Sequence, residues 1–284
     1  MEIREFEVER AATAKLPWQA TLVLPVVDVQ LGADTDEEKL KRHIAWGVNN
    51  GAYFVGMGDY VDVASPSNRR ELRSARLYDS VQDLLEAGAA KQVDDFLALV
   101  AGSEGRWLGV LQGHHYFEFS DGTTSDTRIA QALKAPFLGT CAFVRLSFVY
   151  PTSGSRVTCT IWCHHGHGFG ASLTSPIMKL ERLAAYNEAD VFLVGHQPRL
   201  IAASIDQLYA TRSDPPKLRH RTRILASTGG FARTYGQKEH DGRPQGGYGE
   251  QAMYPPAAIG GVVVRVKPER TSDGNVRLDL GVSL

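Results

Sequence analysis

The histidines and acids of this sequence fall into five short groups, each following a run of apolar residues. Six of the nine histidines lie in three of these groups, and acids dominate the other two. The groups, in chain order, are Asp28-Val-Gln30, Gly58-Asp59-Tyr-Val-Asp62, Gly113-His114-His115, His164-His165-Gly166-His167 and Gly195-His196-Gln197-Pro198. Imidazoles and carboxylates together bind Zn, Mn or Fe, and a histidine beside an acid can move protons. Residue types that can bind a ligand or move protons therefore follow each of five predicted strands.

The elements that would position the first three groups are alternating strands and helices. Strand-like apolar runs cover residues 19–28, 52–59 and 106–111. The sequence between them predicts helices over residues 36–49, capped by Asp36 or Thr35, and over residues 68–100. This order favours a parallel sheet covered by helices. In such a sheet the carboxyl ends of the strands meet at one crevice, where ligands gather.

The pattern changes after Pro136. Residues 140–150 and 156–163 alternate like the strands of a hairpin, and a helix is predicted over 176–187. Further strands are predicted at 190–194, 221–227, 260–266 and 276–282, and the segment 236–254, rich in Gly, Pro and Gln, reads as a mobile loop. We therefore expect an α/β fold with two facing mixed sheets flanked by helices. It forms one domain over residues 1–284, with the motifs at about 20–200 and strands from about 205 completing the second sheet.

Composition and charge exclude some classes of partner. The net charge is −1, so no global field attracts an anionic membrane or nucleic acid, although a local basic cleft that binds nucleic acid stays open. No apolar run is long enough to span a bilayer, and the first residues are charged. Three cysteines without an export signal predict reduced thiols and a cytoplasmic location. Cys163, beside the histidines, is either a soft metal ligand or a small buried strand residue.

The order of the five groups resembles the calcineurin-like metallophosphoesterases. That family carries D-x-H, G-D-x-x-D, G-N-H-D/E, a lone H often followed by G, and G-H-x-H. The similarity covers roughly residues 20–200, and the segment Gly58–Asp62 matches its motif in full, whereas the other groups match in part. The resemblance implies a metallophosphoesterase-type sandwich of two mixed β-sheets flanked by helices. It also implies hydrolysis of a phosphate ester by water activated at two metals that share a bridging carboxylate.

The resemblance also implies roles for individual residues. By position, one metal would be held by Asp59, His114, His165 and His196. Asp59 falls on the bridging acid, and the set of one carboxylate and three imidazoles suits Zn, Mn or Fe. His165 is favoured over its neighbours at 164 and 167 because a glycine follows it. His115 falls on the histidine that protonates the leaving group, and Asp62 on the acid that orients it and raises its pKa.

Three departures from the family pattern concern the metals. Gln30 replaces the histidine of D-x-H, and Pro198 replaces the final histidine. The pyrophosphatase branch acting on ADP-ribose or CDP-alcohols is similar in carrying D-x-Q, and protein serine/threonine phosphatases lack the last histidine. The first metal position would retain only Asp28, Asp59 and an amide oxygen, so we expect one tight metal and a second that is weak or absent. His114 replaces an asparagine, which could slow turnover or change the substrate.

Simpler roles compete with the functional ones. Asp28 could simply end a strand or cap a turn, without any role in a metal site. Gln30 could make structural hydrogen bonds instead of contacting a metal, and Asp62 could cap a helix. His43 and the pair Arg69-Arg70 read as solvated faces. The leading function is a hydrolase of phosphomonoesters or phosphodiesters. The alternative is a metal- or phosphate-binding pseudoenzyme of the same fold, motivated by the three departures. The substrate class beyond a phosphate ester stays open.

Overall fold

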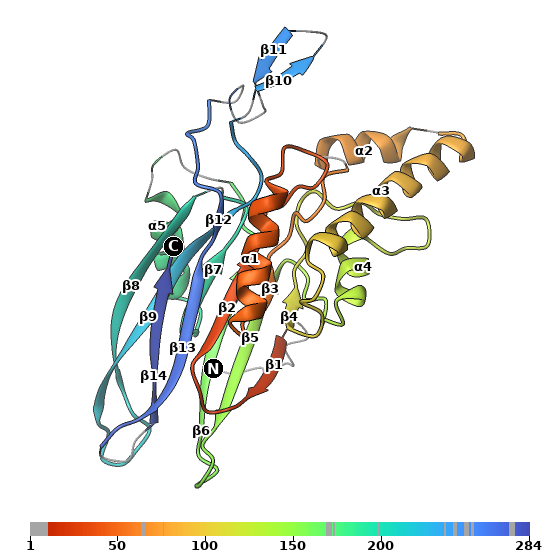
Figure 1. The fold of residues 1–284 in the computed structure, drawn as a ribbon. Helices are drawn as coiled ribbons and strands as arrows, with labels where there is room; N and C mark the ends of the chain where they lie inside the picture. The colour runs from red at the N-terminus through yellow and green to blue at the C-terminus, as the bar shows by residue number, and fades with distance from the viewer. Residues whose placement is uncertain are drawn as a thin grey trace, which may run out of the picture.

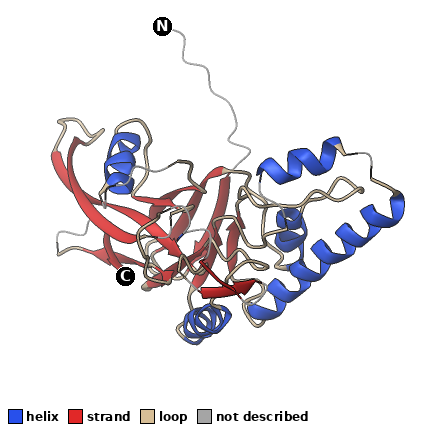
Figure 2. Cartoon of the chain, turned by 90° about the horizontal axis from the view of Figure 1, so that it is seen from above, coloured by secondary structure: helices blue, strands red, loops and turns tan. Residues whose placement is uncertain are grey.

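The computed structural model of the 284-residue chain shows two mixed β-sheets with helices outside them (Figures 1 and 2). This confirms the predicted α/β class. The structure describes residues 11–63, 66–75, 77–168, 172, 174–197, 199–235, 237–240, 243–246, 250, 253–272 and 276–284. Pro198, where the family pattern has its last histidine, lies outside the described residues.

The first sheet carries the three parallel strands expected from the sequence. Its strand order is β14-β13-β2-β3-β4. The strands are β2 (Thr21–Val26), β3 (Tyr53–Gly56), β4 (Trp107–Val110), β13 (Val263–Arg270) and β14 (Val276–Ser283). β2, β3 and β4 are parallel to one another, whereas β13 pairs antiparallel with β2 and β14 pairs antiparallel with β13. Helices α1 (Glu37–Asn49), α3 (Asp79–Leu99) and α4 (Ser125–Ala132) pack against this sheet.

The second sheet has the order β1-β5-β6-β7-β9-β12, with β8 paired to β9. Its strands are β1 (Ala11–Leu16), β5 (Cys141–Val149), β6 (Arg156–His164), β7 (Val191–Val194), β8 (Leu200–Ala210), β9 (Leu218–Gly230) and β12 (Gly260–Gly261). Helix α5 (Ser175–Ala184) covers its outer face. The strands beyond residue 205 therefore do not all complete the second sheet as predicted, because β9 and β12 lie in it whereas β13 pairs with β2 and β14 pairs with β13 in the first sheet.

The core lies between the sheets and beneath the helices. Val23 of β2 belongs to the cluster between the two sheets, whereas Leu24 belongs to the cluster under α1 and α3. Successive side chains of a strand point to opposite faces, so both faces of β2 are buried. Burial on both faces explains why this strand reads as a continuous apolar run. Cys163 is also buried between the sheets, as the simpler reading of that thiol predicts.

Several local features differ from the sequence expectations. The single helix expected over 68–100 is two helices, α2 (Pro66–Ser74) and α3, because Tyr78 adopts an extended backbone at the start of α3. Helix α4 was not expected. Thr124 caps it and exchanges hydrogen bonds with Thr127. The expected loop over 236–254 contains a described antiparallel pair, β10 (Gln237–His240) and β11 (Arg243–Gly246), and its other described residues are 250, 253 and 254. No helix among the described segments combines the length and apolarity needed to cross a bilayer.

His43 is not solvated as the sequence suggested. Its ring lies 5.3 Å from the ring of Phe231, and its Nε2 atom is buried without a hydrogen-bond partner among the described residues. The charged sequence of α1 does not reveal this environment, because the surroundings of one helix position depend on the segment that packs over it. Burial lowers the pKa of His43 to about 4.

The half-buried position of His43, with its Nε2 atom enclosed, predicts a pH-dependent stability. The unfolded chain takes up a proton at His43 near pH 6.5, whereas the folded chain does so only near pH 4, so stability should fall as the pH falls through this window. Between about pH 7 and pH 4, the wild type should lose on the order of 2–3 kcal/mol more free energy of unfolding than His43→Gln. Urea denaturation at both pH values measures the difference. The same change at exposed His220 is the control, and equal losses in His43→Gln and the wild type would contradict the prediction.

Candidate metal centre

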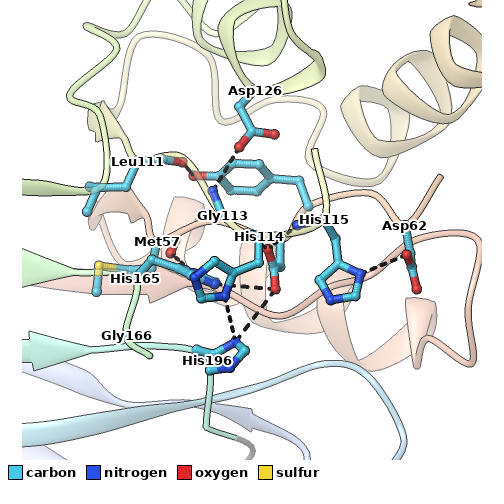
Figure 3. A network of polar contacts seen from close by, with 12 residues as sticks. Met57, Asp62, Leu111, Gly113, His114, His115, Asp126, His165, Gly166 and His196 are labelled. Atoms are coloured by element: carbon cyan, nitrogen blue, oxygen red, sulfur yellow. Dashed lines mark hydrogen bonds and ion pairs between the residues drawn. The ribbon is translucent and has the colours of Figure 1, made fainter. Parts of the chain in front are cut away.

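The side chains of the predicted site come from five loops, each at the carboxyl end of a strand. Asp28 follows β2, Asp59 follows β3 and His114 follows β4 in the first sheet, while His165 follows β6 and His196 follows β7 in the second. β2, β3 and β4 are parallel to one another, as are β6 and β7. The two sheets therefore deliver their loops to a common place (Figure 3).

Sharp backbone turns aim these side chains. Asp28, Asp59 and His196 have φ values of 47°, 56° and 59°, a left-handed conformation that is unfavourable for residues with a Cβ atom. Such strain is characteristic of functional sites, where the surrounding structure compensates for it. Gly113 allows a close approach, because a Cβ atom there would lie 2.0 Å from Oδ1 of Asp59. The glycine before the two histidines is thus required by packing against the motif of the neighbouring strand.

Four residues bring one possible ligand atom each to a single point. They are Asp59, His114, His165 and His196, and their ligand atoms all lie within 4.8 Å of one another. Nε2 of His165 is 3.3 Å from Oδ2 of Asp59, and Nδ1 of His114 is 3.3 Å from Nδ1 of His196. Tetrahedral zinc with bonds of about 2.0–2.1 Å separates its ligand atoms by about 3.3–3.4 Å. The arrangement therefore fits a small divalent ion.

Buried polar atoms that lack a hydrogen bond lie at the same point and support this fit. Oδ2 of Asp59 and Nε2 of His165 are buried and, among the described residues, make no hydrogen bond. The other polar atom of each side chain is hydrogen-bonded to the backbone. Oδ1 of Asp59 accepts the backbone N–H groups of His114 and His115, and Nδ1 of His165 donates to the carbonyl of Met57 at 2.7 Å. Metal ligands are oriented in this way, with one atom anchored by the protein and the other directed at the ion.

Burial and mutual contact set the charges of the cluster. Burial, together with His165 and His196, lowers the pKa of His114 to about 4, so its imidazole is neutral near pH 7. Burial opposes a proton on His165 as well, but the contact with Asp59 outweighs it and raises the pKa of His165 to about 9. The contacts of Asp59 with His165 and His196 hold the pKa of Asp59 well below its usual value, against the effect of burial. A bound ion would replace the proton of His165, which links metal binding to proton release.

Of the three histidines in this loop, the structure places only His165 in the group of four. Nδ1 of His164 accepts the N–H of Gly166 at 2.7 Å, and its ring lies 5.6 Å from the ring of Trp162, away from the cluster. His167 is exposed, with its ring 5.6 Å from that of His114. Neither belongs to the group of four.

The residues expected for the other metal position are not part of this group. Asp28 is buried, its Oδ1 atom lacks a partner among the described residues, and burial together with Asp59 raises its pKa to about 8. Gln30 is half-buried, and its backbone N–H donates to the carbonyl of Asp59 at 2.9 Å. A weak or absent second metal therefore stays a prediction.

A histidine–carboxylate pair lies beside the four residues. Nδ1 of His115 is 2.8 Å from Oδ1 of Asp62, and both side chains remain partly exposed. In Figure 3 the ring of His115 faces Asp62, whereas His114, His165 and His196 face one another. Burial lowers the pKa of His115, but the bond to Asp62 outweighs it, so the net pKa is raised. The pair can therefore hold a proton at the edge of the cluster.

Two positioning residues were missed or misread in the sequence. Asp126, in the first turn of α4, is buried and accepts the N–H of Gly113 at 2.9 Å, and burial raises its pKa to about 7. Arg69, expected to be solvated, donates to the carbonyls of His114 and Tyr116. No sequence signal connects either residue to the third motif, since both contacts are with backbone atoms.

Comparisons with known proteins add little to this geometry. No protein-family model matches the chain, and no curated protein matches it in sequence. Among solved structures, it is similar to Vps29 of Chaetomium thermophilum, with 9% sequence identity and a TM-score of 0.34, over 92% of this chain and 96% of that one. A likeness of this size carries no argument about function, so the conclusions about this chain depend on its own side chains.

Proposed function

We propose that this protein is a metal-dependent phosphoesterase of the calcineurin-like type, hydrolysing a phosphomonoester or a phosphodiester. One observation carries the proposal. A buried carboxylate and three imidazoles direct ligand atoms at one point, and a separate histidine–carboxylate pair lies beside them. The proposed ion is divalent Mn, Zn or Fe, and its four ligands would be Asp59, His114, His165 and His196. The pair has no role in holding that ion, so it is available for proton transfer.

The chain's own residues have distinct roles in this reaction. Asp59, His114, His165 and His196 would hold a divalent ion, which when bound would polarise a phosphoryl oxygen and lower the pKa of an attacking water. Asp62 accepts a hydrogen bond from the Nδ1–H group of His115, which fixes the tautomer and the direction of the ring. Nε2 of His115 then donates its proton to the oxygen of the leaving alcohol. The raised pKa of His115 keeps that proton available near neutral pH.

Hydrolysis of two chromogenic esters tests the proposal. The purified protein, stripped of metal by a chelator and reloaded with Mn, Zn or Fe, should hydrolyse p-nitrophenyl phosphate or bis(p-nitrophenyl) phosphate with at least one ion. Activity should disappear on chelation and return on reloading. The relative rates on the two esters distinguish a monoesterase from a diesterase. Stoichiometric metal binding without turnover for any ion would contradict the enzymatic proposal.

That negative outcome would favour the alternative function, a metal- or phosphate-binding protein whose chemistry has been lost. This alternative is based on the residues that differ from the family pattern at the metal positions. His114 offers the cluster an imidazole where the family has an amide, and Gln30 offers an amide where the family has an imidazole. Retention of the His115–Asp62 pair favours the enzyme, because metal binding alone does not need it.

A further inference from the structure

The loop that carries His114 and His115 is held by an arginine from a different helix. Nη1 of Arg69, on α2, donates to the carbonyl of His114 at 2.8 Å and to the carbonyl of Tyr116 at 2.8 Å. Its guanidinium also lies 3.9 Å from the centre of the Tyr116 ring, within the range of a cation–π contact. One guanidinium nitrogen thus binds the carbonyls of the two residues that flank His115 in the chain.

Three sets of contacts surround the loop 113–116. Asp126 accepts the N–H of Gly113, and Oδ1 of Asp59 accepts the N–H groups of His114 and His115. These carboxylates are buried. The carbonyls of His114 and Tyr116 accept hydrogen bonds from Arg69, which is only half-buried. Donors and acceptors of the loop are therefore satisfied by different parts of the fold.

Loss of the Arg69 contacts should affect the two histidines unequally. A metal ion and three other ligands would hold the His114 ring in place, even with its carbonyl released. The His115 ring has one described polar anchor, the bond to Asp62, and it is otherwise placed by its backbone. A change of backbone angle near His115 would shift Nε2 relative to the leaving oxygen. A displacement of about 1 Å in such a group can cost roughly 100-fold in rate.

We propose that Arg69 is a positioning residue that sets the geometry of proton donation by His115. The proposal rests on the proposed phosphoesterase function and extends it to α2, a helix with no buried side chain among its described residues. Arg69 is half-buried and contacts this loop, whereas its neighbour Arg70 is exposed.

The test compares substrates with good and poor leaving groups. A p-nitrophenolate leaves readily, whereas the alkoxide of an alkyl phosphate needs a proton in the transition state. In metal-loaded protein, Arg69→Ala should lose on the order of 10- to 100-fold more kcat on the alkyl ester than on the p-nitrophenyl ester. Metal content should be unchanged. Arg70→Ala, the matched control, should hydrolyse both esters like the wild type.

Two further variants separate positioning from folding. Arg69→Lys keeps a cation that can donate to both carbonyls but lacks the planar fork, so it should recover part of the alkyl-ester rate. In a His115→Ala background, Arg69→Ala should add little further loss, because both changes act on the same proton transfer. Equal losses on the two esters, or additive losses in the double variant, would overturn the role of Arg69. A wild-type protein inactive on every ester would instead overturn the proposed function itself, and the positioning role with it.

Discussion

Replacing His165 with alanine is expected to remove the tightly bound metal and, with it, the hydrolytic activity. Nε2 of His165 is buried, makes no hydrogen bond among the described residues, and lies 3.3 Å from Oδ2 of Asp59, its neighbour in the group of four. Affinity for the ion should fall by more than the roughly 10- to 100-fold that the loss of an outer-shell partner typically costs. Metal analysis of protein dialysed against a weak chelator measures the change.

His167→Ala provides the matched control for this result. His167 lies in the same loop and near His114, but it is exposed and outside the group of four, so this variant should retain its metal. His165→Gln, which fills more of the buried space than alanine, checks that metal loss does not follow from unfolding. Folded His165→Ala protein with wild-type metal content would rule out His165 as a ligand.

Replacing His115 with alanine should have the opposite pattern, a large loss of rate with metal content retained. His115 contacts Asp62 through its side chain and Asp59 only through its backbone N–H, so alanine preserves the backbone contact. A general acid typically contributes roughly 10²- to 10⁴-fold, which is the expected fall in kcat. The effect should be largest for esters with poor leaving groups. Steady-state kinetics and metal analysis on the same preparation test both halves of the prediction.

Asp62→Asn should behave as a weaker form of the same change. An amide cannot supply the charge that raises the pKa of His115, so fewer molecules carry the proton near neutral pH. The double variant with His115→Ala should lose little more than His115→Ala alone, since Asp62 acts through the histidine. Metal loss in His115→Ala, or activity equal to that of the wild type, would contradict the assignment of His115 as the proton donor.

The contrast between His165 and Arg69 shows how much of the site was predictable. His165 belongs to a local pattern, a polar group after an apolar strand, and the position of such groups in parallel strands follows from chain direction. Arg69 sits in an ordinary charged helical segment, and its partners are the carbonyls of His114 and Tyr116. Backbone carbonyls are present at every residue, so no residue type in the sequence reveals such a contact.

The sequence by itself determined which strands the site residues follow. Apolar runs mark β2, β3 and β4, and the acids and histidines follow them directly, because local periodicity and strand ends are properties of short segments. Only the tertiary structure decided which of three neighbouring histidines joins Asp59, that Asp126 supports Gly113, and that His43 is enclosed. These outcomes depend on backbone turns and on packing between segments far apart in the chain, which the residue types of one segment do not encode.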